Sequence, residues 1–385
     1  MRTVVFAPEH EDFRKLIRDF IEREVQPVYT QWEAVGHPPR DFYRRLGELG
    51  VLGIQVPTEY GGGGESSMKF NAIVGEETAA RGVSFGNYSV HSNLILPYLL
   101  KYATDEQKQR WLPGFASGDL MTAIAMTEPG TGSDLANIST AARLSADGSH
   151  YVLNGAKTFI TGGLLADLVL VVCRTSAASA EDRRSGLTIL CVESKSAGFE
   201  IGTAIRKIGL KTSDTAELSF ADVRVPVENR LGEEGMAFSY LTHNLAQERL
   251  TIALGASAAA SAALQFALCY VQERRVFGKP VAAFQNTKFE LAECSTLVDA
   301  ITLMADTALE RHDVGELSVP DAARAKLFCT EAAGTVIDKC LQLHGGYGYV
   351  MEYPIARLYA DARVTRIYGG TSEIMKTIIA KSLGL

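Results

Sequence analysis

Residues that favour β-strands are concentrated in the middle third of this chain, and this feature restricts the possible folds most. The runs DLVLVVCR, GLTILCVE and AELSFADVRVP are aliphatic and bounded by glycine, aspartate, serine or proline. On both sides, apolar residues recur at helical spacing. The sequence therefore predicts an α+β chain with three units: an N-terminal helical domain (1–120), a middle antiparallel β domain (121–231) and a C-terminal helical domain (232–385).

Local signals mark where several helices begin and end. Thr104 and Gln107 have the spacing of a capping box, and Pro320 suits the first turn of a helix. Two helices are predicted from apolar residues at helical spacing: Phe13, Leu16, Ile17, Phe20 and Ile21, which stop before Pro27, and Leu291, Cys294, Val298, Ile301 and Ala305.

Composition excludes several classes of function. A net charge of −7 argues against a nucleic-acid surface, which needs clustered basic residues. The six cysteines form no C-x-x-C pair, so we expect reduced, mostly buried thiols and a cytoplasmic protein. The N-terminus has no signal or transit pattern. No metal site is expected, since Cys/His clusters and H-E-x-x-H are missing from the sequence.

An uncharged segment from Leu250 to Val271 is long enough to span a bilayer. Alanine and serine dominate it, however, and the rest of the chain contains nothing similar. Small residues allow helices to pack closely, so we interpret the segment as a buried helix in a soluble core and expect no membrane association.

Glu248 is a candidate catalytic residue within a long predicted helix. It shares a stripe, in steps of three and four, with apolar or small residues: Leu241, Leu245, Ile252, Gly255 and Ala259. A carboxylate on such a face loses hydration, which raises its pKa towards the value that suits a general base. The alternative is a structural ion pair with an arginine other than the adjacent Arg249. Spacing alone leaves both interpretations open.

Several glycine-rich segments are individually uninformative. TEPGTGSD (127–134) has no lysine and fits neither the P-loop nor the dinucleotide signature. NGAKTFITGG (154–163) puts Phe159 and Thr161 on one face of a predicted strand. ERRVFGKP (273–280) and QLHGGYGY (342–349) are more typical of helix ends than of binding sites, and His344 is interpreted as a structural residue. RIYGGTSEIM (366–375) is a glycine turn that leads into the last helix.

Together and in this order, these motifs resemble those of the acyl-CoA dehydrogenase family of flavoproteins, along essentially the whole chain. The resemblance is to the long-chain and isovaleryl branch. It implies the acyl-CoA dehydrogenase fold, whose C-terminal domain is a four-helix bundle. It also implies non-covalent FAD between the β domain and the C-terminal helices, and a homo-oligomer, expected to be a tetramer.

The resemblance also implies roles for single residues. Met126, Thr127 and Ser133 would line the flavin and thioester, and Phe159, Ile160 and Thr161 would pack on the isoalloxazine. Contacts to FAD from a neighbouring subunit are implied for Arg274, Phe277, Gln285, Gln342, Gly345 and Gly346. Thr371 and Glu373 match further FAD contacts. Ser133, Arg249 and Gly370 are expected at the substrate.

The catalytic base is where the chain departs from much of the family. Many members carry the catalytic glutamate in the glycine turn, where this chain has Gly369. The long-chain and isovaleryl branch takes its base from the long helix instead, in a Glu-Arg motif that matches Glu248 and Arg249. The resemblance therefore assigns the base to Glu248. The backbone N–H of Gly369 remains as a hydrogen-bond donor to the thioester carbonyl.

The implied reaction is FAD-dependent α,β-dehydrogenation of an acyl thioester, on coenzyme A or a carrier protein, to the trans-2-enoyl product. Glu248 would remove the α-proton, and flavin N5 would accept the β-hydride. Electrons would pass to an electron-transfer flavoprotein. Two alternatives remain: a flavin-dependent monooxygenase or oxidase on the same fold, and a non-catalytic acyl-thioester-binding protein.

Overall fold

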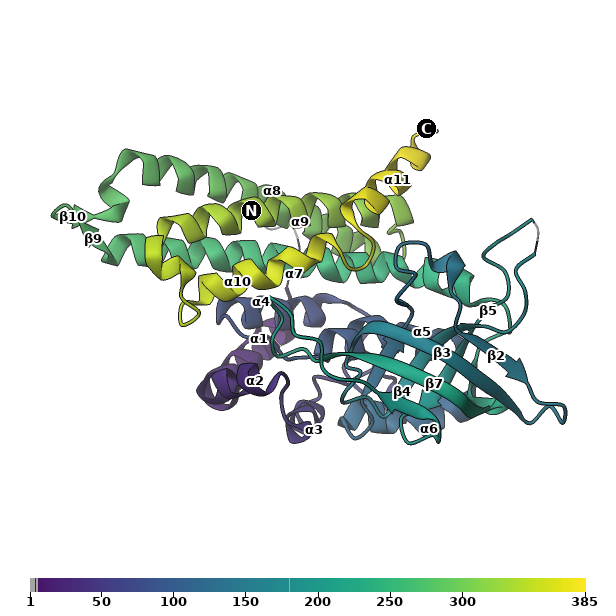
Figure 1. The fold of residues 1–385 in the computed structure, drawn as a ribbon. Helices are drawn as coiled ribbons and strands as arrows, with labels where there is room; N and C mark the ends of the chain where they lie inside the picture. Colours follow the sequence, from purple (N-terminus) through teal and green to yellow (C-terminus); the bar gives the residue numbers. More distant parts are fainter. Residues whose placement is uncertain (1–3, 5, 180) are drawn as a thin grey trace.

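The computed structural model describes residues 4, 6–179 and 181–385, and it has the predicted order of helices, strands and helices (Figure 1). The N-terminal helices lie beside the β domain, and the long C-terminal helices pack over both. The fold is the predicted α+β arrangement.

The N-terminal domain packs amphipathic helices around a core rich in aromatic rings, which includes Phe20, Trp32, Phe42 and Phe85. Its helices are α1 (Pro8–Phe20), α2 (Tyr29–Val35), α3 (Arg40–Glu48), α4 (Lys69–Ala80), α5 (Leu96–Tyr102) and α6 (Asp105–Ser117). The predicted capping box is confirmed, because the Thr104 hydroxyl accepts from the Gln107 N–H.

The middle domain is a mixed sheet with strand order β6-β7-β3-β2-β4-β5-β8. Its strands are β1 (Thr122–Ala125), β2 (Ala141–Leu144), β3 (His150–Thr161), β4 (Leu168–Arg174), β5 (Leu187–Glu193), β6 (Phe199–Ile201), β7 (Thr215–Pro226) and β8 (Arg230–Leu231). The prediction of a wholly antiparallel domain is wrong, because β4 pairs in parallel with β1 and, through one residue pair, with β2. Between β2 and β4 the chain runs back through β3, which is antiparallel to β2, so that β4 has the same direction as β2.

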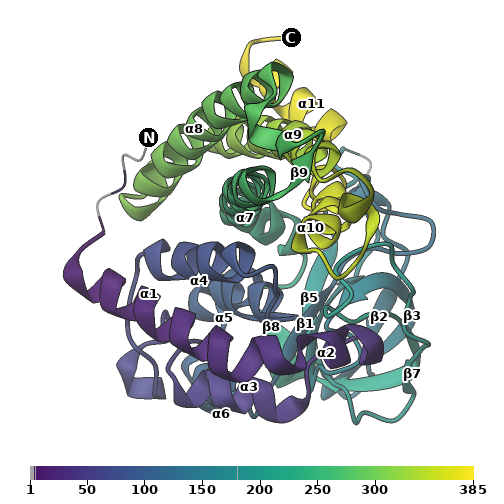
Figure 2. The ribbon, with the colours of Figure 1, turned by 90° about the vertical axis from the view of Figure 1, so that its left-hand side faces the viewer.

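The C-terminal domain is built around α7 (Ala237–Glu273), which lies in the centre of the molecule when it is viewed along the helix (Figure 2). The long helices α8 (Gln285–Asp313) and α9 (Val319–Leu343) pack on it, and α10 (Pro354–Ala362) and α11 (Ser372–Ser382) complete the bundle. By length and hydropathy alone α7 could cross a membrane. Its alanines instead form the core of this domain, as predicted.

The end of α7 leads into a small hairpin of β9 (Arg275–Val276) and β10 (Lys279–Pro280), at the end of the bundle farthest from the β domain (Figure 1). The predicted α8 is confirmed. So is Pro320 in the first turn of α9, where Ser318 caps the helix. All six cysteines are free and only Cys269 is exposed, which confirms the expected reduced, mostly buried thiols.

Candidate active site

The carboxylate of Glu248 is unpaired. The residue is half-buried on α7, and within the described part of the chain its oxygens form no hydrogen bond or ion pair. The alternative of a structural arginine partner is therefore not supported. The predicted stripe is right as far as Ile252, which is buried, but Gly255 is exposed. α7 is surrounded by other elements, so no single stripe describes its buried surface.

Loss of hydration raises the pKa of Glu248, while the charges of Arg249 and Lys326 lower it in part. Burial raises the pKa values of Tyr98 from α5 and Tyr368 from the glycine turn, and the Glu248 charge raises both further, so both tyrosines lie within its electrostatic reach. The carboxylate thus sits between α5, α7, α9 and the glycine turn. A carboxyl group with a raised pKa and no partner is suited to accept a proton.

Gly369 faces the same space as this carboxylate. A Cβ atom at position 369 would lie 3.3 Å from Oε1 of Glu248 and 2.4 Å from Cδ1 of Ile252. Gly369 and Gly370 have φ of +62° and +90°, a backbone region that glycine adopts readily and other residues rarely. The turn and the helix therefore offer two alternative positions for one carboxylate.

The glycine turn is fixed on α9 by two buried or half-buried side chains. Lys326 donates to the carbonyl oxygens of Tyr368, at 2.6 Å, and of Gly370. Glu331 pairs with Arg366 at 3.1 Å and accepts from the Ser372 hydroxyl at 2.5 Å. Both ends of the turn are thus tied to the same helix, which gives its backbone N–H groups a defined direction.

Thr371 has a structural role that the sequence did not indicate. Its hydroxyl accepts from the Ile374 N–H at 3.3 Å and caps α11. This hydroxyl and the N-terminal N–H of Glu373 itself lower the pKa of the Glu373 carboxyl. The FAD contacts expected for these two residues remain predictions.

In the β domain, a buried ion pair joins two of the motifs. Lys157 of NGAKTFITGG donates to Glu128 of TEPGTGSD and to the Met126 carbonyl, each at 2.9 Å. The Thr158 N–H adds a bond to the Thr127 carbonyl. Burial alone would raise the pKa of Glu128, but hydrogen bonds from Ser139, Thr140 and Lys157 hold it at about 2. The pair connects the residues expected at the flavin into one surface.

Phe159 stands out on this surface. The strand alternation breaks at a bulge between Lys157 and Ile160, and Phe159 adopts φ of +58° with 65% of its surface exposed. Strain of this kind in an aromatic residue points to a functional constraint. A flat ring system would cover the exposed phenyl group. Thr127, whose carbonyl accepts from the Thr158 N–H, and Thr161, two residues after Phe159 along β3, are partly exposed near it. The residues present therefore fit an isoalloxazine.

The other residues predicted at FAD lie far away, at the β9–β10 end of the bundle. Arg274 stacks over the ring of Tyr347 at 5.4 Å, and Phe277 and Tyr349 are 94% and 90% exposed. Along α7, Arg274 is about 39 Å from Glu248, at about 1.5 Å per residue. His344 caps α9 and stacks on Tyr270, as the structural interpretation predicted.

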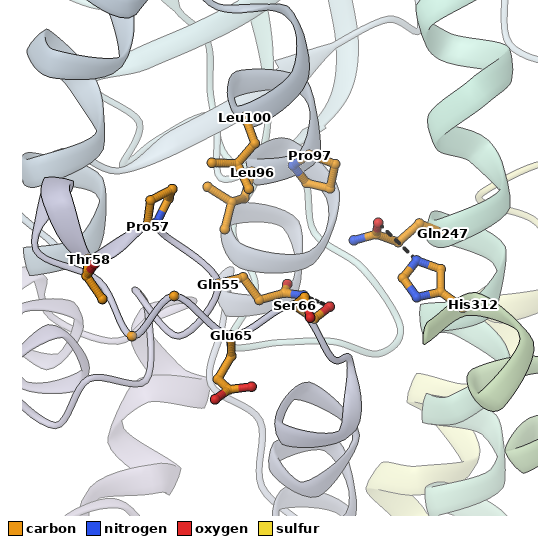
Figure 3. A pocket seen from close by; sticks show the side chains of 12 residues that line it. Gln55, Pro57, Thr58, Glu65, Ser66, Leu96, Pro97, Leu100, Gln247 and His312 are labelled. Carbon is orange, nitrogen blue, oxygen red and sulfur yellow. Dashed lines mark hydrogen bonds between the residues drawn. The ribbon is translucent and has the colours of Figure 1, made fainter. Parts of the chain in front are cut away.

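A separate hollow of about 570 Å³ lies between the loop before α4, α5 and the C-terminal helices (Figure 3). It is lined by Pro57, Leu96, Leu100, Gln247 and His312, among others, and Gln247 approaches His312 at 3.3 Å. Glu248 is not part of its wall. The hollow is thus adjacent to the carboxylate along the helix but distinct from it.

Lys326 was not predicted as a site residue, although its position in the sequence pattern indicated one. Lys326 is on a buried stripe of α9 in steps of three and four, with Ala322, Cys329, Ala333, Val336 and Cys340. Glu248 lies on a stripe of the same kind on α7. The position of Tyr98 near Glu248 could not be predicted from the sequence, because it depends on how the two helical domains pack.

Comparisons with known proteins agree with the fold and with the motifs. Residues 7–119, 123–223 and 235–384 match the N-terminal, middle and C-terminal domains of acyl-CoA dehydrogenases. The mitochondrial long-chain specific acyl-CoA dehydrogenase of Sus scrofa is 42% identical over 379 residues, which are 98% of this chain and 87% of that protein.

Solved structures are similar over the whole chain. An acyl-CoA dehydrogenase from Geobacillus kaustophilus has 44% identity and a TM-score of 0.95, covering 99% of both chains. A glutaryl-CoA dehydrogenase from Mycobacterium smegmatis in complex with FADH2 has 29% identity and a TM-score of 0.88, covering 98% of this chain and 95% of that one.

Proposed function

This chain belongs to the acyl-CoA dehydrogenase family, and on that premise we propose that Glu248 is the base of an acyl-CoA α,β-dehydrogenation. The observation that carries the proposal is the unpaired carboxylate opposite Gly369, with the Cβ position of 369 only 3.3 Å from its oxygen. The protein is an FAD-dependent oxidoreductase of acyl-CoA, like its family.

Each residue of the site has its own proposed role. Glu248 takes the α-proton, helped by a raised pKa. The Gly369 N–H donates to the thioester carbonyl oxygen, where negative charge develops as the proton leaves. Met126, Thr127, Phe159, Ile160 and Thr161 hold the flavin, which when bound accepts the β-hydrogen as hydride. Ser133, Arg249 and Gly370 are proposed to contact the acyl-CoA.

For the substrate we propose a long, unbranched acyl chain on coenzyme A. The support is the long-chain specificity in the name of the Sus scrofa relative. Reduced enzyme would pass electrons to an electron-transfer flavoprotein. A carrier-protein thioester is the alternative acyl donor.

We also propose that the protein forms a homo-oligomer, namely a tetramer. Its support is the distance of about 39 Å along α7 between Glu248 and Arg274, which is too long for both to serve one flavin ring in a single chain. Phe277 and Tyr349, almost fully exposed in the single chain, would be covered by a second copy.

Anaerobic mixing with a panel of thioesters tests the proposal. The yellow FAD-loaded protein should bleach with long-chain acyl-CoAs and less with short-chain, branched or carrier-bound ones. A binding protein would only change the spectrum, and a monooxygenase would need an added reductant. Full bleaching by butyryl-CoA but not by palmitoyl-CoA would contradict the long-chain assignment.

A further inference from the structure

Lys326 is a charged side chain with only 1% of its surface exposed. Lysine is almost never buried without a partner for its charge. Within the described chain, its ammonium group has no carboxylate partner at hydrogen-bonding distance and donates to two backbone carbonyl oxygens instead. Burial lowers its pKa to about 8, against the opposing charge of Glu248. The two carbonyl contacts therefore account for its position.

The two acceptors flank Gly369. One is the carbonyl of Tyr368, at 2.6 Å from Nζ, and the other is the carbonyl of Gly370. The left-handed conformations of Gly369 and Gly370 let both carbonyls face the same ammonium group.

The carbonyl of Tyr368 and the N–H of Gly369 belong to one planar peptide unit, and the described chain has no cis peptide bond. In a trans peptide the two bonds point in opposite directions. Lys326 therefore fixes, from one side, the direction in which the Gly369 N–H points on the other. Within the described chain this N–H has no hydrogen-bond acceptor.

A hydrogen bond to a peptide carbonyl also polarises the peptide and strengthens its N–H as a donor. A cationic donor has the larger effect, because charge-assisted hydrogen bonds are stronger than neutral ones. The Gly369 N–H is thus oriented and strengthened by the same contact.

We propose that Lys326 is a positioning residue that orients and polarises the Tyr368–Gly369 peptide, so that its N–H stabilises the charge developing on the thioester carbonyl. The inference rests on the proposed function, since it takes Gly369 as the donor. Lys326 acts through the peptide and does not contact the substrate.

The test is the carbonyl stretch of a trans-2-enoyl-CoA, labelled with ¹³C at the thioester carbonyl and bound to the FAD-loaded protein. This infrared readout involves no proton transfer, so it reports on the carbonyl contact and not on the reactivity of Glu248 as a base. Wild-type protein should lower the stretching frequency relative to free ligand. Lys326→Met should keep less than half of that lowering and reduce the flavin roughly 10- to 100-fold more slowly.

Two controls are matched to this variant. Lys339→Met removes a lysine from the same helix, where it pairs with Glu290 and Glu293, and should keep the full lowering. Glu248→Gln should also keep it, because the carbonyl contact does not need the base.

A full lowering in Lys326→Met, or no lowering in wild type, overturns the proposal. If Lys326→Met does not retain FAD, Lys326→Gln decides, because its shorter side chain cannot reach both carbonyls. A smaller lowering then supports the role, and a lowering equal to wild type overturns it. Failure of the proposed function looks different, since wild-type flavin would then resist reduction by every acyl-CoA.

Discussion

At the scale of single residues, Glu248 on α7 and Gly369 in the glycine turn face the same region of the site. A carboxylate side chain should therefore be able to act from either position. We predict that Glu248→Gly abolishes flavin reduction and that adding Gly369→Glu recovers part of it. Recovery should be incomplete, because a side chain at φ of +62° costs roughly 1–2 kcal/mol. Stopped-flow reduction by acyl-CoA measures it.

Ile252 provides a control for this exchange. Its Cδ1 lies 2.4 Å from the new Cβ, and Ile252→Val removes that methyl group at a cost of about 0.5–1.5 kcal/mol of stability. The triple variant should therefore reduce flavin faster than the double one. Equal inactivity of the single, double and triple variants would argue against the shared geometry.

The pH dependence of flavin reduction follows from the surroundings of Glu248. Only the ionised carboxylate accepts a proton, so the rate should rise with pH through a midpoint above the usual range of a carboxyl group. The Arg249 charge lowers that pKa, so Arg249→Gln should move the midpoint to higher pH. A midpoint that stays in place or falls would show that another group controls the rate.

At the scale of elements, the Glu128–Lys157 pair joins β3 to the turn after β1. We predict that Glu128→Gln lowers the free energy of unfolding by about 3–5 kcal/mol, because it leaves a buried ammonium group uncompensated. Adding Lys157→Met should recover part of the loss. Urea unfolding measures both, with the exposed Glu200→Gln on β6 as the control.

The stabilising contribution of the Glu128–Lys157 pair should depend on pH in a defined direction. The pKa of Glu128 is lowered from 4.5 to about 2, so its contribution is fully present above pH 4.5 and is lost as pH falls towards 2. The deficit of Glu128→Gln should shrink over that interval. A deficit independent of pH would mean that the contribution is not ionic.

Sequence patterns predicted the elements well where their own periodicity determines them. Residues Leu291 to Ala305 form part of one helix, and Thr104 caps another, because both features depend on neighbours within a few positions. Phe159 departs from the predicted alternation because a β-bulge precedes Ile160, and no residue spacing announces it. The parallel pairing of β1 with β4 depends equally on contacts distant in sequence.

At the scale of the whole molecule, the β9–β10 hairpin should carry an interface between copies. We predict that Phe277→Asp gives a smaller species in analytical ultracentrifugation and loses FAD more readily, because the exposed ring would be buried in the oligomer. The control Val35→Asp changes an exposed residue of the N-terminal domain. A wild-type monomer that retains FAD would contradict the shared site.

The arrangement of the candidate site was predictable only in part. The helical stripe made Glu248 a candidate but left a structural ion pair open, and only the resemblance to the family, through its Glu-Arg motif and Gly369, assigned the base to it. The contact of Lys326 with the turn joins positions 42 and 44 residues apart, so it depends on how α9 packs against the end of the chain. Relations of this kind belong to the tertiary fold, which the periodicity of single elements does not determine.

The proposed reaction depends on removal of the α-proton by Glu248. Its most direct test is the rate of anaerobic flavin reduction by acyl-CoA in Glu248→Gln, with FAD content and ligand affinity measured alongside. We expect a loss of about 10²- to 10⁴-fold while FAD and ligand still bind. Reduction within a few-fold of the wild-type rate would contradict it.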